Sequence, residues 1–303
     1  MSRLDALFYF FENLIWDMQR SRKKLLTFVG TIAGVVAAVL LFVNVILPHI
    51  NYGIAMGHVK KGEYAEATQI LKKLGDFKDS EEYTRIYSLL AAEPGDKLFF
   101  GSFEQDNNLD NGPEDLEWIV LDTDGDKVLL TTSYLIQPLA FSKNFDMATW
   151  DISGARAWCN NDFYNVAFDE DERSAVVLTH LESPMNPTYP DRPAGEATDD
   201  YVFLLSLEEA EQYFPKDETK YAYATDYAAA QGALVHKETG CSWWWLRTVD
   251  ADRMLSCAVH ASYQIVFNVA DYYGSNVSNP EGCIRPVIWV DSELYASTLD
   301  TAE

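Results

Sequence analysis

Four cysteines offer the widest range of chemistry in this chain, because a thiolate can act as a nucleophile, a metal ligand or a disulfide partner. They are Cys159, Cys241, Cys257 and Cys283. No CxxC pair is present, so the spacing does not indicate a zinc site or a thioredoxin-like redox site. Four cysteines allow three disulfide pairings, and spacing cannot choose among them. The sequence therefore leaves open whether these residues form disulfides or remain buried free thiols.

The five histidines give no catalytic pattern. They are His49, His58, His180, His236 and His260. None lies in an HExxH motif or a recognisable nucleophile motif, and the sequence has no serine-protease or kinase signature. Carboxylates are too numerous for any pair to be assigned as the acid and the nucleophile of a glycosidase. We therefore predict a protein that is not an enzyme and that carries no cofactor.

Two groups of oxygen-bearing side chains are similar in composition to calcium-binding loops. The first comprises Asp106, Asn107, Asn108, Asp110 and Asn111, and the second comprises Asp122, Asp124 and Asp126. The second group begins like an EF-hand loop but lacks the distant glutamate that binds calcium with both oxygens. Aspartate and asparagine also stabilise turns through their own backbone contacts. The sequence therefore predicts polar turns at both places and no metal site.

The segment from Ser262 to Asn279 has the composition of a recognition surface, because tyrosine, asparagine, serine and aspartate fill more than half of it. Tyrosine and asparagine provide large contact area and adaptable hydrogen bonds, as they do in antibody loops. Ordinary exposed loops are also rich in serine, asparagine and aspartate. We predict a ligand-binding surface formed by Tyr263, Asn268, Asp271, Tyr272, Tyr273 and Asn276.

The run of three tryptophans at 243–245 suits either a carbohydrate-stacking platform or a buried strand. In a strand, Trp243 and Trp245 point to one face and Trp244 points to the other, which favours a strand buried on both faces. We therefore predict a structural core that includes Trp243, Trp245, Arg247, Arg285 and Trp289. The two arginines are expected to pair with carboxylates there.

The elements that must position these residues are short and of mixed type. Strand patterns occur at 98–103, 118–121, 128–132 and 283–290, and a mainly helical pattern covers 151–177. Asp124-Gly125-Asp126 predicts a hairpin turn, and Ser206 with Glu209 predicts a capping box that opens a helix. Because strands and helices do not alternate regularly, we predict an α+β fold rather than a parallel α/β sheet.

Residues 25–50 include no Asp, Glu, Lys or Arg, and the continuous apolar part of this segment ends at Pro48. At about 1.5 Å per residue, it is long enough for a hydrocarbon core of about 30 Å. A basic cluster at 20–24 precedes it, so the positive-inside rule predicts a cytoplasmic N-terminus. A cleaved signal peptide would have a shorter apolar region and a cleavage site close behind. We predict an uncleaved transmembrane helix at 25–48, with the remainder of the chain extracellular.

The regions beside this helix suggest partners. The tail at 1–24 has an apolar stripe at helical spacing, which suits an interfacial helix or a partner helix. Gly30 and Gly34 form a GxxxG pattern and predict a homodimer through the transmembrane helix. The formal net charge of -24 repels phosphate backbones, so we predict no nucleic-acid partner. An extracellular protein or glycan is the predicted ligand.

Residues 51–92 have a helical pattern, and the phrase KKGEYAEATQILKKLGDFKDSEEY is similar to a tetratricopeptide-like hairpin. The apolar face is formed by Ala67, Ile70, Leu71 and Leu74. About three repeats are needed for a peptide-binding solenoid, so we predict a stalk. Glu93-Pro94-Gly95-Asp96 then marks a boundary to a domain at 96–292, which a tail at 293–303 follows.

Six segments, taken in order, carry a family resemblance. They are FGSFEQDNN, EWIVLD, ARAWCNNDFYNVAF, VFLLSLEEAEQYF, CSWWWLR and GCIRPVIWV. Together they resemble a widespread bacterial domain of unknown function, which is often found behind a membrane anchor in anaerobic Gram-positive bacteria. The resemblance covers about Lys97 to Asp291, nearly all of the chain beyond the predicted stalk.

The Trp-Leu-Arg at 245–247 and the Arg-Pro-x-x-Trp at 285–289 also resemble the end of the formylglycine-generating-enzyme type of C-type lectin-like fold. This resemblance implies a lectin-like scaffold, which is shared by a cysteine-dependent oxidase and by binding proteins diversified at exposed C-terminal positions. The oxidases use a close cysteine pair, whereas Cys241 and Cys257 lie on either side of the tryptophan strand here. We therefore predict a membrane-anchored, non-catalytic extracellular binding or sensing module. The alternatives are a degenerate enzyme on this scaffold and a structural protein of the cell envelope.

Overall fold

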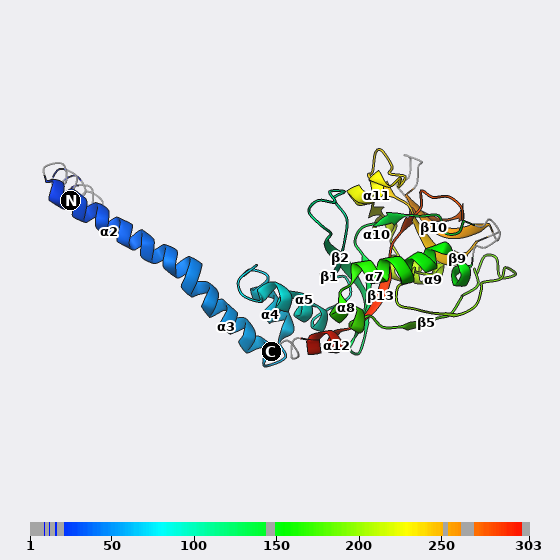
Figure 1. Ribbon diagram of the computed structural model, residues 1–303, viewed down its shortest axis with the longest axis horizontal. Helices are drawn as coiled ribbons and strands as arrows, with labels where there is room; N and C mark the ends of the chain where they lie inside the picture. The colour runs from blue at the N-terminus through cyan, green and yellow to red at the C-terminus, as the bar shows by residue number, and fades with distance from the viewer. Residues whose placement is uncertain are drawn as a thin grey trace. The chain divides into compact units, whose positions relative to one another are not determined.

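The computed structural model describes residues 9, 12, 16, 21–143, 149–250, 254–261 and 270–298, without the side chains of 217, 260, 261 and 270–274 (Figure 1). The chain forms two compact units, Met1–Thr84 and Arg85–Glu303. The first is helical and the second is mixed. The α+β fold that the sequence predicts is therefore confirmed, and so is a long apolar helix near the N-terminus.

The long helix of the first unit runs continuously from Arg22 to Val59, and its apolar window has no buried residues. It consists of α2 (Arg22–Leu41), the π-helical segment η1 (Phe42–Ile46) and α3 (Leu47–Val59). By length and composition, it is the one helix in the described part of the chain that could cross a membrane. A signal sequence would have the same character at this position, so the helix is consistent with a membrane anchor.

Pro48 does not end this helix, although the sequence predicts that it does. A proline ring inside a helix clashes with the carbonyl four residues earlier and has no N–H to donate. The π-helical segment absorbs this conflict, since the Leu47 N–H donates to the Phe42 carbonyl, one residue beyond the α-helical partner. The Asn44 side chain donates to the Leu40 carbonyl at 2.9 Å. The helix therefore widens at the proline and continues.

Two short helices complete the first unit, and α4 (Tyr64–Leu71) packs against α3. Ala67 and Leu71 on the predicted apolar face are fully buried, whereas Ile70 and Leu74 are half-buried. Helix α5 (Ser80–Leu90) begins in the first unit and ends in the second. The Ser80 hydroxyl at the start of α5 donates to the Phe77 carbonyl at 2.6 Å.

The second unit contains two main sheets. The first has the order β1 (Lys97–Phe103), β2 (Glu114–Asp124), β3 (Lys127–Thr132) and β13 (Val287–Asp291). The second has the order β11 (Ala270–Asn276), β10 (Leu255–Ala261), β9 (Trp244–Val249), β12 (Cys283–Ile284) and β4 (Gln137–Pro138). The predicted hairpin at Gly125 is confirmed: Asp124 pairs with Lys127, and Gly125 has a φ of +59°.

The chain passes from one sheet to the other at Arg285-Pro286, where the sequence predicts a single strand. Proline has no N–H for a ladder, so a continuous central strand is disfavoured there. The Pro286 carbonyl instead accepts the Thr132 N–H at 3.2 Å and the Thr131 hydroxyl at 3.1 Å. The two strands β12 and β13 therefore belong to different sheets, and this dipeptide joins them.

Short helices and two small ribbons surround the sheets. The helices are η2 (Trp150–Ile152), α6 (Gly154–Ala157), η3 (Trp158–Phe163), α7 (Tyr164–Ala167), α8 (Glu170–Ala175), α9 (Leu207–Tyr213), α10 (Asp217–Lys220), α11 (Asp226–Ala230) and α12 (Ser292–Ser297). The ribbons pair β5 (Thr179–Leu181) with β6 (Thr198–Asp200) and β7 (Ala222–Tyr223) with β8 (Cys241–Ser242). The capping box predicted at Ser206 and Glu209 opens α9 and is confirmed.

The core of the second unit is built around aromatic side chains. Trp243, Trp244 and Trp245 are at most 2% exposed. The rings of Trp243 and Trp245 meet edge to face with centroids 4.7 Å apart, whereas Trp244 contacts Phe214 on the other side. The strand is therefore buried on both faces, as the alternation indicates, and none of the three rings is available at the surface.

Candidate functional site

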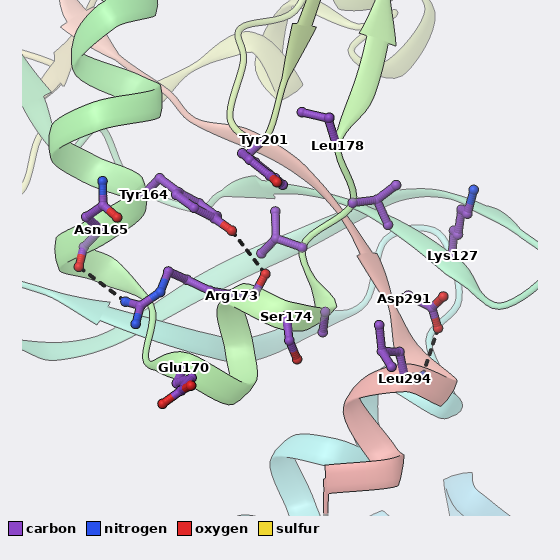
Figure 2. A pocket seen from close by; sticks show the side chains of 13 residues that line it. Lys127, Tyr164, Asn165, Glu170, Arg173, Ser174, Leu178, Tyr201, Asp291 and Leu294 are labelled. Carbon is purple, nitrogen blue, oxygen red and sulfur yellow. Dashed lines mark hydrogen bonds between the residues drawn. The ribbon is translucent and has the colours of Figure 1, made fainter.

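A groove of about 760 Å³ lies in the second unit (Figure 2). It lies among α7, α8, the chain that follows α8, and the end of β13 with α12. Its lining comprises Lys127, Tyr164, Asn165, Glu170, Arg173, Ser174, Ala175, Val176, Val177, Leu178, Tyr201, Asp291 and Leu294. Aromatic, aliphatic and charged side chains therefore meet on one surface.

Helix α8 forms one wall, and a capping box fixes its first turn. The Asp169 carboxylate accepts the Glu172 N–H at 2.8 Å, and Glu172 accepts the Asp169 N–H at 3.0 Å. The Glu172 carboxylate also accepts the Gly101 N–H at 2.8 Å, which ties the helix to β1. Burial raises the pKa of Glu172, although these backbone donors oppose the rise. The helix that carries Arg173 is thus anchored at its start.

Two tyrosines from distant parts of the chain stack beside this helix. The rings of Tyr164 and Tyr201 are 4.5 Å apart and nearly parallel, with 8° between their planes. The Tyr164 hydroxyl donates to the Arg173 carbonyl at 3.1 Å, as Figure 2 shows. Burial, followed by the neighbouring Tyr201, raises the pKa of Tyr164 and keeps its phenol neutral. The pair is a pre-formed aromatic surface at one end of the groove.

Two exposed aliphatic side chains also line the groove. Leu178 is 53% exposed and Leu294 is 46% exposed. Asp291 caps α12, because its carboxylate accepts the Leu294 N–H at 2.8 Å, and this places Leu294 at the edge of the groove. Apolar surface that remains in water is typical of a place where another molecule packs.

Three carboxylates converge on the loop between β1 and β2, away from the groove. The ligand atoms of Glu104, Asp106 and Glu114 lie within 4.8 Å of one another. Asp106 accepts the Asn108 N–H at 2.7 Å and the Asn111 amide at 2.9 Å, and these bonds lower its pKa. Burial and the neighbouring Glu114 and Asp106 raise the pKa of Glu104. The loop's own amides therefore occupy much of this cluster, as in a polar turn.

The four cysteines are buried free thiols, which answers the question that spacing left open. Burial raises the pKa of both Cys257 and Cys283 to about 12 and also raises the pKa of Cys159. A reactive thiol has a lowered pKa and partial exposure, so these three environments are the opposite of a reactive one. The structure gives no support to thiol chemistry at these positions.

The ligand surface predicted between Ser262 and Asn279 lies mostly outside the described residues. Tyr263 and Asn268 are not described, and only the backbone of Asp271, Tyr272 and Tyr273 is described, as part of β11. Asn276 is exposed at the end of β11, where its side chain accepts the Ser278 N–H and hydroxyl. Asn276, whose side chain is described, does not line the groove, and the ligand surface proposed for this segment stays a prediction.

The residues predicted for the structural core have different surroundings. Arg247 is buried and pairs with Glu209, as expected. Arg285 is 2% exposed, but no described carboxylate lies within ion-pair distance, so the expected pairing is wrong. Its guanidinium lies over the rings of Phe214 and Trp244 at 4.7 and 5.0 Å, and the aromatic faces take the place of a carboxylate. Burial lowers the pKa of Arg285 to about 10, and Trp289 is only half-buried.

The groove itself was not predicted from the sequence. Tyr164 and Tyr201 are separated by 36 intervening positions, and Lys127 and Leu294 come from opposite ends of the second unit. No local spacing relates these residues. The sequence carries one usable signal, the S/T/D-x-x-E pattern at Asp169 and Glu172, which indicates the start of α8 but not its neighbours.

The structure thus defines an α+β domain with an open groove, and comparison with known proteins places it in a family. Residues 125–292 match the family described as Domain of unknown function (DUF6273), and the chain belongs to this family. The match confirms the predicted relation to an uncharacterised domain. It begins at the β2–β3 turn and includes every lining residue of the groove except Leu294. No curated protein and no solved structure matches the chain.

Proposed function

We propose that this chain is a membrane-anchored, non-catalytic binding or sensing module, and that its second unit binds a ligand in the groove of Figure 2. The groove is the observation that carries the proposal. Binding sites are typically concave and combine apolar surface with polar groups that orient the ligand, and this groove brings aromatic and aliphatic side chains together with charged ones. The buried thiols with raised pKa values favour binding over cysteine-based catalysis.

The same proposal includes the topology and the scaffold. The apolar helix supports a single-pass anchor, and the basic residues before it support a cytoplasmic N-terminus. The helical hairpin of α3 and α4 supports a stalk of tetratricopeptide-like type. A lectin-like scaffold is supported by the two-sheet α+β architecture, in which the strand that carries Arg247 neighbours the strand before Arg285.

The topology can be tested by adding a protease to intact cells that produce the full chain. We expect the epitope of a C-terminal tag to be lost and the epitope of an N-terminal tag to be protected, because the positive flank keeps the N-terminus inside. Cells opened with detergent serve as the control, in which both epitopes are lost. Protection of the C-terminal tag in intact cells would contradict the extracellular location, and release of the second unit into the medium would indicate a cleaved signal sequence.

Leu178→Asp is expected to reduce ligand binding at least about tenfold while leaving the fold intact. The side chain is 53% exposed, so its replacement alters the groove surface and costs little stability, within about 0.5 kcal/mol. The full chain in nanodiscs is first screened against peptide and glycan arrays, and the selected binder is titrated by fluorescence anisotropy. Leu109→Asp is the matched control, because Leu109 is 75% exposed and does not line the groove. Equal affinities for the two variants would contradict the proposed site.

The surface predicted from the Ser262–Asn279 segment is tested in the same titration. The variant replaces Tyr263, Tyr272 and Tyr273 together with alanine. If this variant loses the binder with an unchanged melting temperature while Leu178→Asp retains it, the ligand site lies on that segment and not in the groove. Loss only in Leu178→Asp would assign the site to the groove.

A further inference from the structure

Two cations of the groove form no ion pair with a described carboxylate. Other cations of the same unit, such as Arg192 and Lys237, also form none, whereas Arg85, Lys97, Arg156 and Arg247 are paired with Asp115, Glu117, Asp200 and Glu209; the groove differs in holding two unpaired cations on one concave surface. Arg173 and Lys127 form no ion pair with any described carboxylate, although the chain has 47 acidic residues against 23 basic ones. An acidic chain that leaves two cations unpaired on one concave surface presents an anion-binding surface.

The guanidinium of Arg173 is held in place before any ligand arrives. Its Nη1 donates to the carbonyls of Phe168 and Asn165, and Figure 2 shows the second of these bonds. Its Nε and Nη2 donate to no described group. The edge of the guanidinium that carries these two nitrogens therefore remains available to a ligand. A guanidinium edge matches the two oxygens of a carboxylate, and a side chain that is already ordered loses less entropy on binding.

The acidic side chains of the groove do not occupy these cations. Asp291 lies opposite Lys127 in the ladder between β13 and β3, but its carboxylate is used to cap α12. Glu170 precedes Arg173 by one helical turn and forms no described ion pair with it, because the guanidinium is directed toward Phe168 and Asn165. Both cations therefore keep donors for a ligand, while Asp291 and Glu170 disfavour a ligand of uniform negative charge.

The apolar part of the groove favours a peptide over a sugar. Leu178 and Leu294 are exposed aliphatic side chains, and Val176 and Val177 also line the groove. Sugar hydroxyls placed against aliphatic groups would lose their hydrogen bonds with water, which is costly. An apolar peptide side chain would instead be removed from water there.

We propose that the groove binds a peptide segment in which a carboxylate side chain accompanies an apolar one, with the carboxylate on Arg173 or Lys127 and the apolar group against Leu178 and Leu294. This inference rests on the proposed function and adds the ligand class to it. The ligand is a protein segment of mixed acidic and apolar character, not a glycan and not a polyanion.

The test uses the full chain in nanodiscs and a library of fluorescent peptides, each with aspartate and glutamate or with asparagine and glutamine at matched positions. We expect binding to prefer the acidic member of each pair by about tenfold to a hundredfold, the range for hydrogen bonds to charged groups. Arg173→Gln and Lys127→Gln are expected to reduce this preference. Lys237→Gln, which removes a charge outside the groove lining, is the matched control.

The outcomes separate this inference from the function it rests on. If peptides bind through the groove but acidic and amide members bind equally, the carboxylate assignment is overturned and the binding function stands. If Arg173→Gln and Lys127→Gln behave like Lys237→Gln, the assignment is overturned as well. If no peptide binds but a glycan does so in a Leu178-dependent manner, the ligand class is wrong while the groove remains a binding site. If neither class of ligand binds, both proposals fail.

Lys127 donates no described hydrogen bond through its side chain, so its variant stays informative even if Arg173→Gln fails to fold.

Discussion

Gly101→Ala is expected to lower the free energy of unfolding of the second unit by about 2–5 kcal/mol. Gly101 has a φ of +70°, where a side chain costs roughly 1–2 kcal/mol. A Cβ atom there would also lie 2.6 Å from the Ala167 carbonyl oxygen and 2.7 Å from the Phe168 ring. Forcing such contacts apart costs about 1–3 kcal/mol more. Because domains are stable by only about 5–15 kcal/mol, this loss is a large share of the whole.

The expected loss also affects the groove, since the Gly101 N–H donates to Glu172 at the start of α8. The loss in unfolding free energy is measured by chemical denaturation followed by tryptophan fluorescence, because every tryptophan except Trp16 lies in the second unit. Gly125→Ala is the matched control: Gly125 has a φ of +59°, but nothing lies within 4 Å of the added Cβ. That variant should lose only the conformational part, about 1–2 kcal/mol. Equal losses in the two variants would show that close packing at Gly101 is unimportant.

The parts of the fold that the sequence predicts correctly are those with local causes. The turn at Gly125 requires a positive φ that glycine adopts readily, and the capping box at Ser206 and Glu209 is closed within one helical turn. The burial of Trp243–Trp245 follows from the alternation of a strand and the size of the side chains. Each of these features depends on a few consecutive residues, so a single sequence is enough to indicate it.

Two places in the fold depart from the local preference of a proline, one through the neighbouring segment and one through a distant contact. Pro48 is normally a helix breaker, but five residues of π-helix before it remove the clash. Arg285-Pro286 divides an apparent strand because Thr131 and Thr132 on β3 offer partners for the Pro286 carbonyl. Local spacing in the sequence cannot predict the contacts of Thr131 and Thr132 with Pro286, since these residues are more than 150 positions apart.

The groove is the extreme case of the same limitation. Its tyrosine pair, its two cations and its aliphatic side chains come from five segments, and none of the five has an unusual composition. The ligand surface at Ser262–Asn279 was predicted from amino-acid composition alone. Ordinary loops are also rich in serine, asparagine and aspartate. Candidate ligand sites made by tertiary convergence therefore require the fold before their residues can be related.

Arg247→Met is expected to lower the free energy of unfolding by about 1.5–3 kcal/mol, because it removes charge-assisted hydrogen bonds between a buried arginine and Glu209, which is 30% exposed. The Arg247 side chain is 6% exposed, and its Nη2 donates to Glu209 at 2.9 Å while Nη1 donates to Glu209 and to the Leu204 carbonyl. The matched control is Arg85→Met, whose pair with Asp115 is 34% and 47% exposed. That surface pair should contribute less than about 1 kcal/mol. A loss at Arg247 as small as the loss at Arg85 would contradict the structural role.

The pH dependence supplies a second test of the same pair. Burial opposes the ionisation of Glu209, but the hydrogen bonds and charge of Arg247, helped by Ser206, outweigh it and lower its pKa. A carboxyl whose folded pKa is depressed contributes stability above its unfolded pKa of about 4.3 and loses it as the pH falls further. The difference in unfolding free energy between the parent and Arg247→Met should therefore be constant from pH 7 to about pH 5 and shrink in more acidic buffer. Glu209→Gln keeps a side chain that suits the capping box but cannot titrate, so on that background the difference should not change with pH. A difference that shrank equally on both backgrounds would assign the acid sensitivity to other carboxylates.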